Sequence, residues 1–60
     1  MIPPDFVTAV AGELKQQGAA FDPADLTAFV ADAWPRFSGL PEPLRCAHDF
    51  IQAGRATLPA

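Results

Sequence analysis

Hydrophobic and polar positions repeat with a helical period in three segments of this chain, and prolines and glycines separate the segments. No segment shows the strict alternation of apolar and polar residues that is typical of a β-strand. The pattern therefore predicts an all-α fold, either a small three-helix bundle or a helical hairpin with a third helix packed across it. We expect one domain, residues 1–60, with helices at about 4–17, 22–34 and 42–56.

The middle segment has the clearest boundaries. Asp22 is suited to cap a helix N-terminus, and Pro23 to occupy its first turn. Pro35 lacks a backbone donor and disfavours helical geometry at the preceding residue, so a regular helix should end just before it. We expect the apolar stripe of this helix to face the core, so that loss of Phe29 or Trp34 unfolds the domain. The stripe consists of Leu26, Phe29, Val30, Ala33, Trp34 and Phe37.

The boundaries of the first and third helices are less clearly marked than those of the middle helix. In the first, apolar residues at helical spacing lead to Gly18, which can adopt the left-handed conformation that ends a helix. In the third, Gly54 has two interpretations: it ends the helix, or it lies inside the helix where a neighbour approaches closely. The apolar face predicted for the third helix consists of Leu44, Ala47, Ile51, Gly54 and Leu58, with Phe50 on its flank.

Size and composition limit what can stabilise such a fold. Half of the 60 residues are hydrophobic, and the formal net charge is −3. A chain of this length buries little surface, and its single cysteine cannot form an internal disulfide. Stability must therefore come from good helix packing or from association with another chain.

The candidates for chemistry do not form a site at the expected helical geometry. Cys46 and His48 lie two residues apart and should point about 200° away from each other, so the imidazole cannot take the thiol proton. Asp25 and Asp32 lie seven residues apart, about 10 Å along a helix, which is too far to share a metal ion. We expect Asp32 to pair with Arg36 instead, if the helix continues past Pro35. The sequence predicts no catalytic residues, no cofactor and no metal.

Small-molecule ligands and membranes are also not expected as partners. A domain of this size has little interior for a ligand pocket of about 300 Å³, so the aromatic residues should form the core. No apolar run approaches the roughly 20 residues that span a bilayer. The first residues lack the basic start and apolar stretch of a secretory signal, and together with the lone thiol this predicts a cytoplasmic protein.

One feature of the middle helix points away from the core. The side opposite the apolar stripe carries small residues that let another helix approach closely, although alanine is also simply the best helix former. We therefore expect a non-enzymatic helical protein–protein interaction module: an accessory or regulatory subunit of a larger complex, or a homo-oligomer. Its predicted partner-binding residues are Ala24, Thr27, Ala28 and Ala31.

The alternative is a small dimeric DNA-binding or antitoxin-like regulator. The second and third helices can be drawn as a helix-turn-helix, with Arg45, His48, Gln52 and Arg55 facing a groove. Glu42 at the start of the third helix would repel phosphate, and only four basic residues are scattered along the chain. Nucleic acid is therefore not the expected partner.

Overall fold

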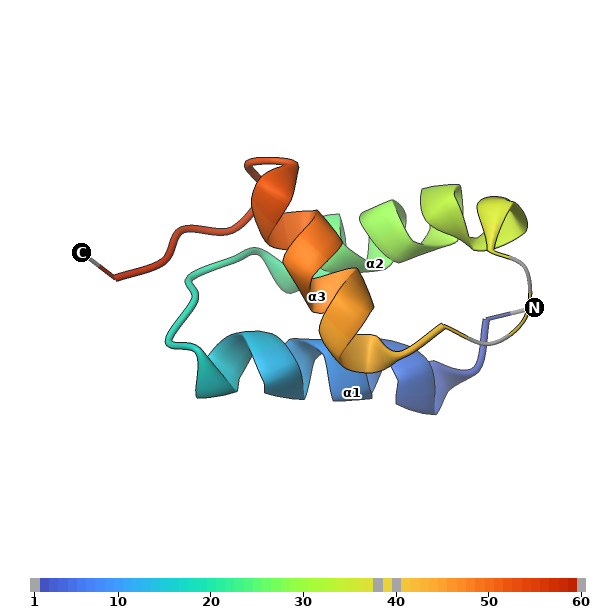
Figure 1. Ribbon diagram of the computed structural model, residues 1–60, viewed down its shortest axis with the longest axis horizontal. Helices are drawn as coiled ribbons and strands as arrows, with labels where there is room; N and C mark the ends of the chain where they lie inside the picture. The colour runs from blue at the N-terminus through green and yellow to red at the C-terminus, as the bar shows by residue number, and fades with distance from the viewer. Residues whose placement is uncertain (1, 38, 40, 60) are drawn as a thin grey trace.

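The computed structural model describes residues 2–37, 39 and 41–59. α1 and α2 run beside each other in opposite directions, and α3 crosses both obliquely (Figure 1). The predicted all-α three-helix bundle is confirmed, and it takes the form of a helical hairpin with a third helix packed across it. The elements are α1 (Pro4–Gln16), α2 (Pro23–Ala33), the 3₁₀ turn η1 (Trp34–Arg36) and α3 (Pro43–Gln52).

α1 ends in the conformation that its glycine predicts. Gly18 has a φ of 74°, in the left-handed region. The Ala19 amide donates to the Leu14 carbonyl at 3.0 Å, closing the C-terminus by a bond that runs back over the last turn. The helix stops at Gln16, one residue earlier than predicted.

α2 begins and ends where its prolines and its capping residue predict. The Asp22 carboxylate accepts a hydrogen bond from the Ala24 amide at 3.0 Å, which satisfies a donor left free at the helix N-terminus. Trp34 and Pro35 belong to η1, which continues α2 directly. Trp34 keeps helical dihedral angles (φ −53°, ψ −46°), contrary to the expected effect of the following proline. Pro35 lies in the first turn of η1, where its missing donor is tolerated.

α3 is shorter than predicted, and the range 42–56 was wrong at its C-terminal end. The helix stops at Gln52, and Gly54 follows with a φ of 78°. The Arg55 amide donates to the Phe50 carbonyl at 3.3 Å, the same closing bond as at the end of α1. Gly54 therefore ends the helix and does not lie inside it.

The buried face of α3 also differs from the prediction. Cys46, Ala47 and Phe50 are the buried residues of this helix. Leu44 and Leu58, which were predicted on the apolar face, are 44% and 45% exposed. The predicted apolar face included Gly54 and Leu58, which lie beyond the end of the helix at Gln52. The predicted face therefore omitted Cys46 and placed Phe50 only on its flank.

The core is centred on Phe50. Its ring makes edge contacts with Phe29 and Phe21, at centroid distances of 5.2 and 6.1 Å. Trp34, expected as a core residue, is only partly buried and packs its ring edge-on to Phe6 at 5.2 Å. The buried residues are Phe6, Val10, Leu14, Leu26, Val30, Cys46, Ala47 and Phe50.

Candidate functional site

The predicted partner-binding face is the outer side of α2. On the inner side, Leu26 and Val30 are 1% and 0% exposed, and they hold the helix against the core. Burial of these two side chains sets the rotation of α2 about its own axis, so the opposite side of the helix faces solvent. All four predicted residues on that outer side are exposed: Ala24, Thr27, Ala28 and Ala31.

The side chains of this outer face are short and expose little hydrogen-bonding capacity. Three of the four are methyl groups, and the Thr27 hydroxyl donates to the Pro23 carbonyl of its own helix at 3.1 Å. Such a surface lets a second helix approach to the close end of ordinary interhelical distances, about 8 Å. Apart from the Thr27 hydroxyl, which is bonded within its own helix, the face presents methyl groups.

An ion pair lies at the C-terminal end of α2. Arg36 of η1 pairs with Asp32 at 2.7 Å, one helical turn earlier, so the predicted Asp32–Arg36 pair is confirmed. The side chains of Arg36 and Asp32 are 72% and 78% exposed. An exposed pair of this kind contributes only a few tenths of a kcal/mol.

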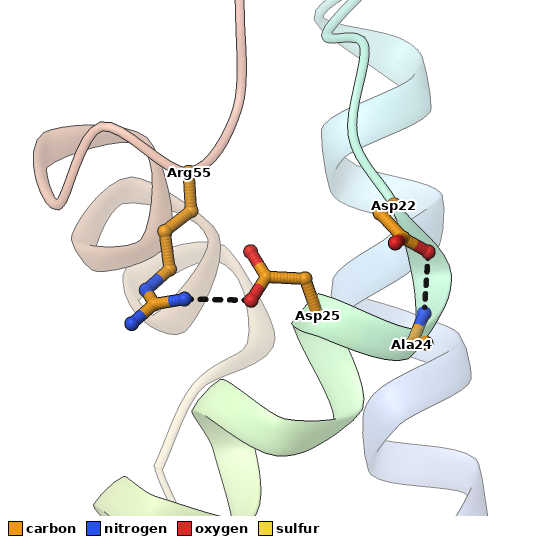
Figure 2. Close-up of polar contacts among 4 residues, drawn as sticks. All are labelled: Asp22, Ala24, Asp25 and Arg55. Carbon is orange, nitrogen blue, oxygen red and sulfur yellow. Dashed lines mark hydrogen bonds and ion pairs between the residues drawn. The ribbon is translucent and has the colours of Figure 1, made fainter.

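A second ion pair lies at the N-terminal end of α2 and joins two distant parts of the chain. Asp25 pairs with Arg55 at 2.6 Å, and the two side chains point toward each other from α2 and from the segment after α3 (Figure 2). The Arg55 guanidinium also lies over the Phe29 ring, 5.8 Å from its centroid. Sequence reasoning missed this pair and placed Arg55 on the exposed side of the third helix.

The two charges of this pair are less exposed than those of the first. The Arg55 and Asp25 side chains retain 47% and 33% of their accessible surface. Thirty positions separate the two residues in sequence, so no local spacing rule connects them. Asp25 and Asp32 thus each pair with a different arginine.

The Cys46, His48 and Asp49 group is divided between core and surface. Cys46 is buried, whereas His48 and Asp49 are exposed, in agreement with the predicted separation of thiol and imidazole. Burial raises the pKa of the Cys46 thiol, and the nearby Asp49 carboxylate raises it further. The thiol is therefore protonated and shielded at neutral pH, which makes it a poor nucleophile.

Within residues 2–37, 39 and 41–59, no group of three or more His, Cys, Asp or Glu side chains is placed to hold a metal ion. None of the helices in these ranges has both the length and the apolar character needed to cross a bilayer.

An open hollow of about 520 Å³ lies where η1 leads toward α3. It is larger than the pocket that sequence reasoning considered too large for this domain. Ser38 and Leu40 lie outside the described residues. The lining carries two positive and two negative charges, with no excess of either sign: Arg36, Phe37, Gly39, Pro41, Glu42, Arg45, Cys46 and Asp49.

Comparison of the chain with protein-family models, with curated proteins and with solved structures gives no match. Its function is therefore inferred from its own residues and contacts.

Proposed function

We propose that this chain is a non-enzymatic helical module that binds another protein chain. The partner is either a different protein, for which the chain is a small accessory or regulatory subunit, or a second copy. The observation that carries the proposal is the outer face of α2. Its four small residues are exposed along a helix whose other side is fixed in the core: Ala24, Thr27, Ala28 and Ala31.

The size of the core supports this proposal. Eight of the described residues are buried, and a single core of this size in a chain of 60 residues rarely supplies more than about 3–5 kcal/mol of stability. Association with a partner stabilises the folded state by mass action, which is valuable for a marginal domain. The lone reduced cysteine is compatible with a place in the cytoplasm.

Affinity capture with matched variants tests the proposal. The tagged chain, an Ala28→Arg variant and a Gln16→Arg control are used to capture proteins from the native source. Arginine at 28 places a long charged side chain in the middle of the outer face, where it prevents close helix packing. Gln16 is exposed on α1, so the control adds the same residue away from that face.

The proposal predicts that the original chain and the Gln16→Arg control retain the same partner, and that Ala28→Arg loses it. Light scattering on the purified chain shows in parallel whether that partner is a second copy. A partner retained equally by all three chains would overturn the assignment of this face.

The rival function is a dimeric DNA-binding or antitoxin-like regulator. Arg45 and His48 are exposed on α3, which favours it. Against it, Arg36 and Arg55 are both engaged with carboxylates, and Glu42 occupies the N-cap of α3. Salt-sensitive binding to duplex DNA near physiological ionic strength would promote this rival above the interaction module.

A further inference from the structure

The segment after α3 passes the loop that joins α1 and α2 and is hydrogen-bonded to it. Gly54 reverses the chain, and residues 55–59 then run beside the loop that joins α1 and α2 (Figure 1). We name residues 55–59 the C-terminal strap.

Two backbone hydrogen bonds hold the strap to that loop. The Ala20 amide donates to the Thr57 carbonyl at 2.8 Å, and the Thr57 amide donates to the Ala20 carbonyl at 2.9 Å. They form an isolated antiparallel bridge that no neighbouring strand extends within the described residues. An isolated bridge has no ladder to make it cooperative, so these two bonds depend on the other contacts of the strap.

The polar side-chain contacts come from the start of the strap. Arg55 pairs with Asp25 at 2.6 Å and covers the Phe29 ring (Figure 2 shows the pair).

Ala56 packs against the core. Leu58 lies beside Ile51, and Pro59 lies near Gly18, but both side chains remain exposed. No residue of the strap is fully buried, whereas each helix of the bundle buries two or three side chains in the core.

We propose that the C-terminal strap is a releasable latch, which opens as a unit while the three helices stay folded. The Asp25–Arg55 pair controls how often it opens. Segments with few buried apolar contacts open at much lower free energy than the core, and a half-exposed ion pair weakens as salt rises. Release uncovers the ring face of Phe29, so ionic strength sets how much aromatic surface the domain exposes. This inference does not depend on the proposed partner.

Amide hydrogen exchange measured by NMR on the folded chain tests the latch. Ala20 and Thr57 should exchange through one shared opening, with protection at least about tenfold lower than that of Val30 and Phe50 in the helices. Raising NaCl from 20 mM to about 500 mM should accelerate exchange at Ala20 and Thr57 alone, in the unaltered chain and without any substitution.

Substitutions at the ion pair then identify its role. Asp25→Asn should accelerate exchange at Ala20 and Thr57 by about two- to fivefold and abolish the salt effect there. Arg55→Gln should do the same, and because it leaves the first turn of α2 unchanged it separates the ion pair from any effect on that helix. Asp32→Asn removes an equal charge from the other pair and should leave both amides unaffected.

Two results would overturn the latch. One is that the Ala20 and Thr57 amides exchange as slowly as the Val30 amide. This would mean that the strap opens only when the whole domain unfolds. The other is a salt effect of undiminished size in Asp25→Asn and Arg55→Gln.

Discussion

The two sides of α2 differ in the size of their side chains and in their burial. The inner side buries Leu26 and Val30 and carries Phe29 against Phe50. The outer side presents the exposed small residues, Ala28 at their centre. The large apolar side chains of this helix lie against the core, whereas the small ones lie in solvent and contribute little to that core.

The strongest test of this division is a pair of neighbouring substitutions, one on each side. Leu26→Ala removes a fully buried side chain and should lower the free energy of unfolding by about 2–5 kcal/mol, enough to unfold much of a domain this small. Thr27→Ala, one residue along, should change it by about 0.5 kcal/mol or less, because Thr27 is exposed. Urea unfolding followed by circular dichroism measures both. Equal losses would remove the distinction between the two sides.

The pH dependence of stability tests whether the core around Cys46 excludes water. Burial first, and Asp49 second, raise the pKa of the Cys46 thiol above its ordinary 9.0 in the folded chain. The unfolded chain therefore loses the thiol proton at lower pH than the folded chain. The stability from this group is complete below about pH 9 and is lost as pH rises above it, by at most about 1.4 kcal/mol per pH unit.

Cys46→Ala separates this effect from other alkaline titrations. The variant is less stable at neutral pH because it leaves a small cavity, but its stability should decline less steeply above about pH 9. Urea unfolding at several pH values measures the two slopes. The same slope in both chains would mean that the thiol is not shielded from water in the folded state.

Much of the bundle could be predicted because its boundaries are encoded locally. Asp22 and Pro23 start α2 within one turn, and Gly18 closes α1 through bonds to the residues just before it. Gly54 gives the same local signal at the end of α3. The predicted third helix continued through it because Leu58 lies at a helical spacing beyond, although that residue belongs to the strap.

The rest depends on contacts between distant parts of the chain. The central place of Phe50 is set by Phe21 and Phe29 from another segment, and periodicity along α3 cannot report them. The Asp25–Arg55 pair likewise exists only because the strap returns to α2. Of the candidate site, the exposure of the outer face followed from the helical pattern alone. The hollow near α3 did not, because its lining combines residues of η1 with residues of α3.

The central claim is that the outer side of α2 does not contribute to the chain's own fold. Its most direct test is also the one with the smallest expected effect. The measurement is the free energy of unfolding of Ala28→Arg, at a concentration where light scattering gives a monomer. Arginine is a good helix former and position 28 is exposed, so the value should stay within about 0.5 kcal/mol of the original. A loss of about 2 kcal/mol or more would place Ala28 in the chain's own packing and contradict the account.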